Sequence, residues 1–338
     1  MNSSKIGFAL SVLAGSLAFA AFASLAACSS VPPAKQQIDD VKTRAAQSSD
    51  AGNSYFRQGQ YAQALRMFQD SLDLNLSVDN REGAVLSYSS IGKALLATGD
   101  TAGARKAFQN AHSISDDLKD QTLITRSQLN IAELYLKLGG QATDATADEN
   151  NAHAISILEQ LTAGITAKSN EDDTAVIYHD LGTAYARKAR FSDAIDYLKR
   201  ALALNEKLKR VPEQAANHYM LASVYSRENQ FIEASTEIET ALALDKKWEN
   251  SPGIGEDLYA AGKIAERAGE REKAYGFYSR SLSVFLAIDS VAGARRAVES
   301  LATTARALQK NDDAVGYEKM LRDINAAGSA AGSTAGAK

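Results

Sequence analysis

The chain has 338 residues, of which 45% are apolar and 23% are charged, the balance of a folded domain that faces water. The net charge is −4 at pH 7 and no block is rich in Lys or Arg, which argues against a nucleic-acid partner. One Cys excludes an intramolecular disulfide framework and any Cys-based metal cluster. With four Pro and no alternating β-branched runs, the body of the chain is predicted to be all-α.

Residues 1–27 have the features of an export signal: one Lys near the start, a long apolar run, and small residues at the end. The residues LAAC at 25–28, which span the end of this region and the Cys that follows it, resemble the bacterial lipoprotein signal. The resemblance implies cleavage between Ala27 and Cys28, acylation of Cys28, and a mature chain of residues 28–338. The alternative is an uncleaved transmembrane helix with an incidental Cys. We favour the lipoprotein, because the single Cys falls where that signal requires one.

Residues 28–43 then comprise the lipidated Cys and a short, partly extended tether. Ser29 and Ser30 follow the Cys with no Asp beside it. By analogy with enteric lipoproteins, this favours the periplasmic face of the outer membrane over the inner membrane. The expected location is therefore the bacterial cell envelope, with the protein held to the membrane by its N-terminal lipid.

A motif recurs seven times between residues 44 and 324, at a spacing of 40 residues with one step of 50. One position is always Gly or Ala: Gly52, Gly92, Ala132, Gly182, Ala222, Gly262 and Ala302. A second position is always Ala: Ala64, Ala104, Ala154, Ala194, Ala234, Ala274 and Ala314. Apolar residues surround both positions at i, i+3, i+4 and i+7, so each position lies on one face of a helix. The period predicts stacked pairs of antiparallel helices, with the small residues marking where the two helices touch.

The expected turn between the two helices of a unit has a left-handed residue, a conformation that Gly adopts most easily. The positions concerned are Gly59, Gly99, Gly139, Gly269 and, as the next-best residue, Asn229. Ala189 and Gln309 occupy the same place, and there the helix end is predicted to differ.

The step of 50 residues comes from a polar segment at 139–151 in the third unit, which we predict to be a solvated loop. Its acidic residues lack the regular ligand spacing of a calcium loop. The tail at 325–338 has low complexity and is predicted to be disordered.

These features resemble the tetratricopeptide repeat (TPR), carried in the fourth unit by Leu181-Gly182, Tyr185, Ala194, Leu198 and Ala201, with matching places in the other units. The resemblance covers residues 44–324. The unit looks like a long variety of 40 residues, where the usual TPR unit has 34. It implies an all-α, right-handed superhelical solenoid of about seven antiparallel helix pairs.

In the TPR family, the first helix of each unit lines a concave groove in which partners dock. The resemblance therefore places a partner-binding groove on units three to six. Its residues are Arg126, Asn130, Glu133, Lys137, His179, Thr183, Arg187, Tyr219, Ser223, Arg227, Tyr259, Lys263 and Arg267. A row of guanidinium groups beside two Tyr suits an acidic or C-terminal peptide. The alternative is that cations in the last turn of a helix simply complement the helix dipole, and both interpretations stay open.

The sequence offers no catalytic motif and no metal site. His112, His153, His179 and His218 are the only histidines. His179 and His218 fall on first helices of adjacent units, but two imidazoles with no carboxylate or Cys at ligand spacing make a poor metal site. No nucleophile elbow, metalloprotease helix or phosphate-binding loop occurs. We therefore expect neither enzymatic activity nor a cofactor or metal.

The leading hypothesis is a lipid-anchored periplasmic scaffold or adaptor that binds a protein or peptide in its groove. Similar family members help assemble pili, secretion machinery or cell-wall enzyme complexes, and the sequence does not choose among these. The alternative is a ligand- or substrate-binding accessory lipoprotein of a transport or polysaccharide export system. A third hypothesis, an enzyme with an unrecognised site, has no motif in its favour.

Overall fold

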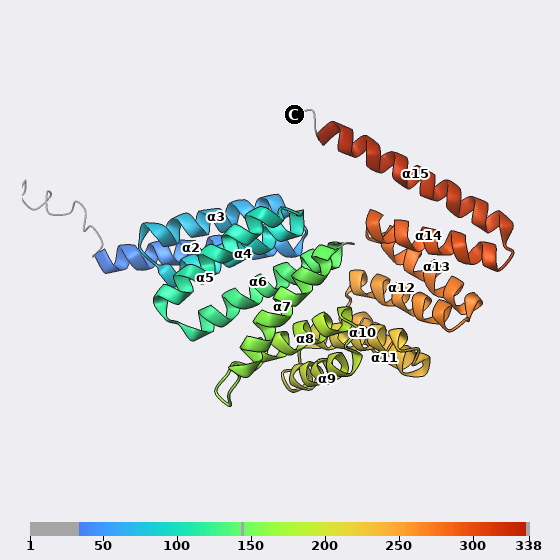
Figure 1. The fold of residues 1–338 in the computed structure, drawn as a ribbon. Coiled ribbons are helices and arrows are strands. Elements are labelled where there is room, and N and C mark those ends of the chain that lie inside the picture. Colours follow the sequence, from blue (N-terminus) through green and yellow to red (C-terminus); the bar gives the residue numbers. More distant parts are fainter. Residues whose placement is uncertain (1–33, 143–144, 336–338) are drawn as a thin grey trace, which may run out of the picture. The chain divides into compact units, whose positions relative to one another are not determined.

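A computed structural model of the protein describes residues 34–142 and 145–335, and side chains only as far as residue 326. Over these ranges the chain forms fourteen helices and no strand (Figure 1). The helices are α2 (Ala34–Arg57), α3 (Tyr61–Ser77), α4 (Arg81–Thr98), α5 (Thr101–Leu118), α6 (Gln121–Gln141), α7 (Ala145–Ala163), α8 (Glu171–Arg187), α9 (Phe191–Lys207), α10 (Val211–Arg227), α11 (Phe231–Lys247), α12 (Ser251–Arg267), α13 (Arg271–Ala287), α14 (Val291–Ala307) and α15 (Asn311–Ala335). The predicted export signal, its cleavage site and Cys28 lie outside the described residues.

The helices form seven consecutive pairs, which confirms the predicted all-α fold of antiparallel helix pairs over the described residues. We refer to α2, α4, α6, α8, α10, α12 and α14 as the first helices and to the others as the second helices. From α8 onward the first helices begin at residues 171, 211, 251 and 291, so the sequence period of 40 is also the period of the structure. No helix in the described ranges has the length and apolar character of a membrane span.

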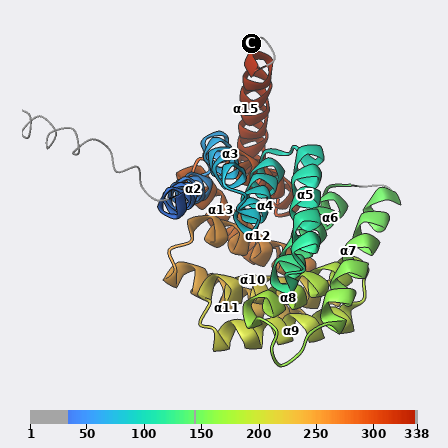
Figure 2. The ribbon, with the colours of Figure 1, turned by 90° about the vertical axis from the view of Figure 1, so that its left-hand side faces the viewer.

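The chain divides into two compact units, residues 1–87 and 88–338, with the boundary inside α4. In the first unit, α2 packs on α3 around Ala45, Phe68 and Leu72. In the second unit, from α5 onward, every helix packs on the next one in the chain, and α6, α8, α10, α12 and α14 also contact one another in that order. Figure 2 shows α8, α9, α10 and α11 next to one another. The apolar core of the second unit therefore passes from pair to pair, as expected of repeats that cannot bury their apolar faces alone.

The small residues of the repeat lie where the two helices of a pair cross, as predicted. A Cβ atom on Gly182 would lie 2.7 Å from Leu198 Cγ and 3.1 Å from the carbonyl oxygen of Ala194. A Cβ atom on Gly262 would lie 2.5 Å from the ring of Tyr278. The missing side chain is thus replaced by the large apolar residue of the second helix, which fills the crossing at high density.

The turns inside the pairs share one backbone conformation. Gly59, Gly99 and Gly269 have φ values of 72°, 87° and 82°, which confirms the prediction for these three. The prediction that Ala189 and Gln309 end their helices differently is wrong, because they too are left-handed, with φ of 57° and 60°. The next residue donates its N–H to a carbonyl five residues back in each case, as in Arg190 to Tyr185 (2.9 Å), so packing imposes the turn whatever the side chain.

The predicted loop at 139–151 is mostly helical instead. Helix α6 continues to Gln141 and α7 begins at Ala145, so Gly139 does not end a helix. It is buried against Asn151, whose Oδ1 would lie 2.7 Å from a Cβ at that position. The segment is polar because its helical surface is exposed, and its Ala and Glu residues favour a helix.

Both ends of the repeat region also carry more helix than predicted. Helix α2 begins at Ala34, inside the segment predicted to be a partly extended tether. Helix α15 continues to Ala335, through most of the tail predicted to be disordered. Both segments contain Ala, the strongest helix former, and neither residues 34–57 nor residues 311–335 contain a Pro, so nothing interrupts a helix once it has started.

Candidate functional site

The thirteen residues predicted to form a partner-binding groove all lie on α6, α8, α10 and α12, four first helices that pack side by side in the second unit. We call the solvent-facing side of α6, α8, α10, α12 and α14 the first-helix surface. Seven of the thirteen are exposed on the first-helix surface: Arg126, Glu133, Arg187, Ser223, Arg227, Lys263 and Arg267. Asn130 is buried, so it supports this surface from below.

The three arginines at the ends of α8, α10 and α12 are hydrogen-bonded within the chain. Arg187 donates to the carbonyl of Leu136 in α6, and Arg227 donates to the carbonyl of Ala186 in α8. Arg267 donates from Nε to the carbonyl of Ser226 in α10 at 3.3 Å. Ala186 and Ser226 lie in the last turn of their helices and Leu136 lies five residues before the end of α6, so a cation near each acceptor also complements the dipole of the preceding helix. Each arginine therefore joins its own first helix to the preceding one.

The same residues keep part of their donor capacity. A guanidinium has five N–H groups, and Arg227 uses one of them on a backbone carbonyl while its face lies over the ring of Phe191, 4.8 Å from the centroid. The sequence left two interpretations of these arginines open, a carboxylate-binding row and a helix-dipole role. The contacts show that each of the three arginines is bonded to a backbone carbonyl of the preceding first helix, which is compatible with both interpretations.

His179 is held in a polar chain that crosses between pairs. Its Nδ1 lies 3.0 Å from Asn217 Nδ2, and Asn217 in turn accepts from Asn205 Nδ2 at 2.8 Å. Burial lowers the pKa of His179 to about 4, so the imidazole is neutral at pH 7 and accepts from Asn217. This residue therefore supports the first-helix surface by packing and hydrogen bonding, and it offers no charge to a partner.

Tyr219 and Tyr259 lie in a cluster with two charged residues that the sequence analysis missed. Arg296 on α14 pairs with Glu256 on α12, and its guanidinium stands 5.1 Å from the centroid of Tyr259. The Tyr259 hydroxyl lies 3.3 Å from Ser300 Oγ. Burial raises the pKa of Tyr219, and Glu256 raises it further. We call Tyr219, Glu256, Tyr259 and Arg296 the aromatic–ion cluster.

A signal in the sequence could have found the two charged members of this cluster. Glu256 and Arg296 occupy the same place in successive units, 40 residues apart, and carry opposite charges. Neighbouring units place equivalent residues side by side, so such a pair predicts an ion pair between first helices.

Asp180 is a third residue that the sequence analysis missed. It is partly buried on α8, in the electrostatic range of Glu133 on α6 and Lys93 on α4. Burial raises its pKa to about 7; Glu133 raises it as well, whereas Lys93 and Arg187 lower it. Asp180 therefore titrates close to neutral pH, between two residues of the predicted groove.

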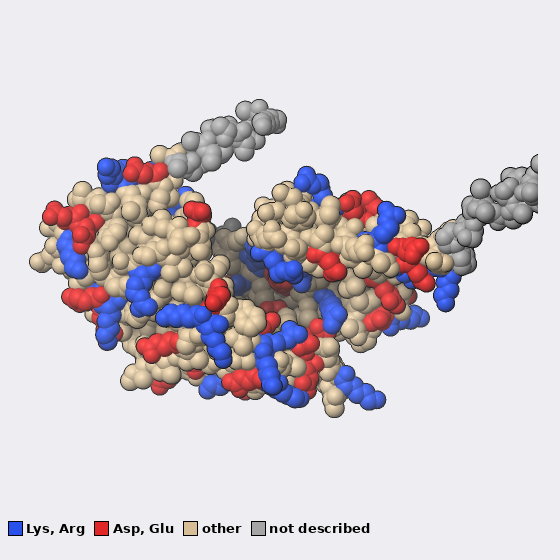
Figure 3. All heavy atoms as spheres, turned by 180° about the vertical axis from the view of Figure 1, so that it is seen from behind, with Lys and Arg blue, Asp and Glu red and all other residues tan. Residues whose placement is uncertain are grey.

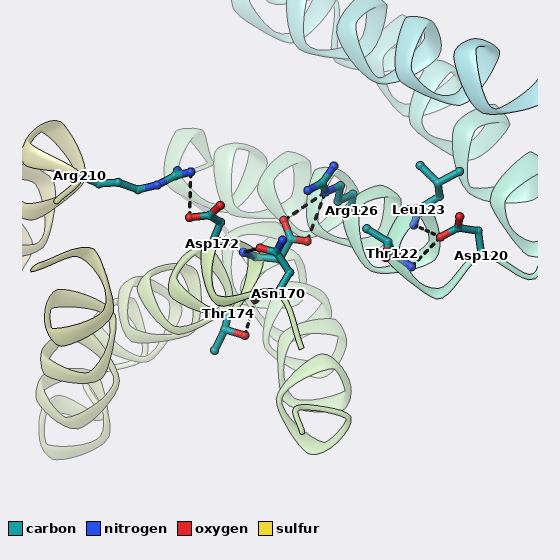
Figure 4. A network of polar contacts seen from close by, with 9 residues as sticks. Asp120, Thr122, Leu123, Arg126, Asn170, Asp172, Thr174 and Arg210 are labelled. Carbon is teal, nitrogen blue, oxygen red and sulfur yellow. Dashed lines mark hydrogen bonds and ion pairs between the residues drawn. The ribbon is translucent and has the colours of Figure 1, made fainter. Parts of the chain in front are cut away.

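The N-terminal edges of α6, α8 and α10 are joined by ion pairs (Figure 4). Arg126 Nε lies 3.2 Å from both carboxylate oxygens of Asp173, and Arg210 lies 2.9 Å from Asp172. Asn170 caps α8 by accepting from the N–H of Asp173. Arg126 was predicted to contact a partner, but in this structure it connects α6 to α8.

A cavity of about 600 Å³ lies beside this network, between the first turns of α6 and α8 and the end of α7. Its wall combines polar side chains, such as Gln121 and Gln160, with apolar ones, such as Leu161 and Ile177. The residues from 164 to 170 that follow α7 form a longer turn than the three residues that separate α9 from α10, and this leaves the space open.

Charge and metal-binding groups are dispersed in the described part of the chain. Lys and Arg alternate with Asp and Glu on the face drawn in Figure 3, without a large area of one sign. No group of three or more His, Cys, Asp or Glu among the described residues could hold a metal ion. His218 instead lies 2.5 Å from a single carboxylate, that of Glu237.

Comparison with protein families finds tetratricopeptide repeats in three segments of the chain, at residues 43–117, 174–208 and 215–247. Comparison of the whole sequence with curated proteins gives no match.

Several solved structures share the fold. A Rap protein complexed with competence and sporulation factor matches 84% of this chain and 77% of its own, with a TM-score of 0.60 and 14% identity. BtubC (BKLC) from P. vanneervenii matches 74% of this chain and 92% of its own, with a TM-score of 0.53 and 18% identity. PilW, described as a widely conserved type IV pilus biogenesis factor, matches 71% and 93%, with a TM-score of 0.50 and 18% identity. At these identities the likeness establishes a TPR-like solenoid and nothing about partners.

Proposed function

We propose that this protein is a scaffold that binds a segment of another protein on its first-helix surface and carries out no chemistry. The observation that carries the proposal is the aromatic–ion cluster. It combines Tyr rings with the exposed ends of an Arg–Glu pair on three adjacent first helices, α10, α12 and α14. Comparable contacts of Arg190 and Arg200 with Tyr rings lie at α9, a second helix. Tyr and Arg are the residues that contribute most to protein–protein binding energy.

The bound segment lies across α10, α12 and α14 in this proposal, where Ser223 and Lys263 extend the cluster with exposed polar groups. The terminal arginines contribute through their remaining N–H groups, while their main role is to hold neighbouring first helices together. A partner with carboxylates remains the expected type, because exposed arginines pair well with carboxylates.

The test uses charge reversal at surface residues that do not join helices. Lys263 pairs only with Glu266 of its own helix, at 2.8 Å, so Lys263→Glu combined with Ser223→Glu should leave the fold intact. We expect the double variant to lose at least tenfold in affinity for proteins that the native chain retains from detergent-solubilised cell envelope. Lys273→Glu, on the second helix α13, is the matched control and should bind normally. Equal binding by both variants would remove the first-helix surface as the docking site.

The alternative function, a ligand-binding accessory, draws on the cavity between α6, α7 and α8. A ligand-binding protein of this kind is expected to hold its compound in an apolar, closed pocket. The cavity described above is partly open to solvent, and polar residues such as Gln121 and Lys168 share its wall with apolar ones such as Leu161. We therefore favour the scaffold.

We further propose that the chain is a lipoprotein with long TPR units of 40 residues, anchored through Cys28 at the periplasmic face of the outer membrane and working in an envelope complex. The support is the single Cys at the end of an export signal and the 40-residue spacing of the first helices. Cys28→Ser should abolish labelling by radioactive palmitate and move the protein from the membrane pellet to the soluble fraction or leave its signal uncleaved. A variant that is still labelled, or membrane-bound after correct cleavage, would refute the lipid anchor.

A further inference from the structure

Two aspartates are buried where the fifth helix pair packs on the sixth, at the interface between α11 and α12. We call an interface of this kind, between the second helix of one pair and the first helix of the next, a seam. Asp245 near the end of α11 is 5% exposed, and Asp257 in α12 is 2% exposed. Asp245 Oδ1 accepts from Asn250 Nδ2 at 3.1 Å, and its other oxygen packs against the backbone of Gly253. Asp257 Oδ2 is buried without a hydrogen-bond partner among the described residues. A buried ionised carboxylate with no cation beside it is strongly unfavourable.

Equivalent places in other seams hold neutral pairs. Asn205 donates to Asn217 at 2.8 Å in the seam one repeat earlier. Asn75 donates to Ser87 at 3.2 Å within the first unit. At the α11–α12 seam, two acids take the place of a neutral donor and acceptor. A carboxyl group can donate a hydrogen bond, as the Asn205 amide does to Asn217, only when it is protonated.

The groups around Asp257 do not neutralise it. On α11 the nearest titratable group is Asp245, on α12 it is Glu256, and on α10 it is Tyr219. Arg296 on α14 is already paired with Glu256. On α13, the Tyr278 hydroxyl donates to Glu266 at 2.9 Å and lies outside the influences on Asp257. The surroundings are therefore apolar or negative.

We propose that Asp245 and Asp257 form a proton-dependent latch that holds α12 on α11 when protonated and loosens this seam when both acids are ionised. Glu256 and Tyr259 lie on the same helix as Asp257, so the latch also controls the geometry of the aromatic–ion cluster. This second consequence rests on the function proposed above, whereas the latch itself does not.

The expected pH dependence follows from the direction of the two pKa values. Burial, and then Asp245 and Glu256, raise the pKa of Asp257 to about 8; burial also raises the pKa of Asp245. An unfolded Asp ionises near pH 4, so the folded seam binds protons more tightly than the unfolded chain. The stabilisation by the latch is therefore complete below about pH 4 and decreases as the pH rises to about 8.

Trp248 reports on this seam directly. It is the single Trp of the chain, caps the C-terminal end of α11 three residues after Asp245, and is 58% exposed. We expect its fluorescence to titrate with a midpoint near pH 8 in the native protein, between pH 5 and 9.5. Asp257→Asn should abolish this titration and still fold, since Asn217 occupies the equivalent place one repeat earlier.

Hydrogen exchange without any ligand gives the second readout. From pH 6 to 9, protection factors of α11 and α12 amides, corrected for intrinsic exchange, should fall on the order of 100-fold in the native protein and stay flat in Asp257→Asn.

The latch is refuted if the native protein and Asp257→Asn show the same pH profile in both readouts. Failure to find a partner at any pH would count against the scaffold instead, because neither readout requires one.

Discussion

At the scale of single residues, glycines in the first helices allow large side chains of the second helices to pack directly against the backbone. Gly182 lies against Leu198 and the backbone of Ala194, and Gly262 lies against Tyr278. In both cases the large residue of the second helix occupies the place where a Cβ would stand. The pattern of Gly or Ala along the chain is therefore a set of complementary contacts.

Gly182→Ala should destabilise the protein, because the added methyl would stand 2.7 Å from Leu198 and 3.1 Å from a backbone oxygen. Overpacking of this kind costs about 1–3 kcal/mol, more than the gain in helix propensity from Gly to Ala. The measurement is the free energy of unfolding from urea denaturation at pH 7.

Gly276→Ala is the matched control, since Gly276 is an exposed helical glycine with nothing within 4 Å of its Cβ position. It should stabilise the protein by about 0.5–1 kcal/mol. If both substitutions stabilise the protein, the crossing at Gly182 is looser than described.

At the scale of helices, the arginines at the ends of α8, α10 and α12 show how far sequence reasoning reaches. Their position in the last turn was visible from the period, and so was a role with the helix dipole. Their acceptors are backbone carbonyls of the preceding first helix, such as Ala186 for Arg227, and a backbone acceptor leaves no mark in the sequence. The bonds that join neighbouring first helices could therefore not be predicted from the sequence.

Arg227→Met tests the joining role. The substitution keeps an apolar contact with Phe191 but removes the donor to Ala186, which should cost about 1 kcal/mol because that carbonyl is left to water. Lys263→Met removes the same charge from an exposed pair and should change the unfolding free energy by less than about 0.5 kcal/mol. Equal effects in thermal and urea unfolding would argue that Arg227 acts only as a surface charge.

The left-handed turn residues were predicted correctly where they are Gly and wrongly where they are Ala or Gln, and this difference has a physical reason. Left-handed Gly59, Gly99 and Gly269 carry a signal because Gly has no Cβ. Ala189 and Gln309 carry none, since packing of the pair forces the same φ on an ordinary residue. The segment at 139–151 was predicted to be a loop but is mostly helical, because polar composition is common to loops and to exposed helices.

At the scale of the whole molecule, stability is expected to follow position in the array. Each helix of the second unit contacts its neighbours along the chain, and α15, at the end of the array, packs on α14 and reaches α13 through the side chain of Tyr275. The largest continuous core lies around α8 to α11, with Leu181, Leu198 and Leu221 fully buried. In such arrays, stability is close to a sum of repeat and nearest-neighbour terms.

Amide hydrogen exchange at pH 6, where the α11–α12 seam is protonated, should therefore be slowest in α8 to α11 and fastest in α15. Leu198→Ala, which removes a buried side chain from α9, should reduce protection mainly in α8, α9 and α10. Uniform loss of protection over every helix would show that the array unfolds as one cooperative unit.

The turns inside the pairs have a further consequence. Gly59, Ala189, Asn229 and Gln309 support the same backbone hydrogen bond and the same sign of φ. The turn of each hairpin is thus defined by its backbone conformation and hydrogen bond, and it forms with different residue types at the left-handed position. A coding segment for one hairpin could be duplicated or lost in a single recombination event and still join cleanly, so proteins built this way are free to change length in whole steps during evolution.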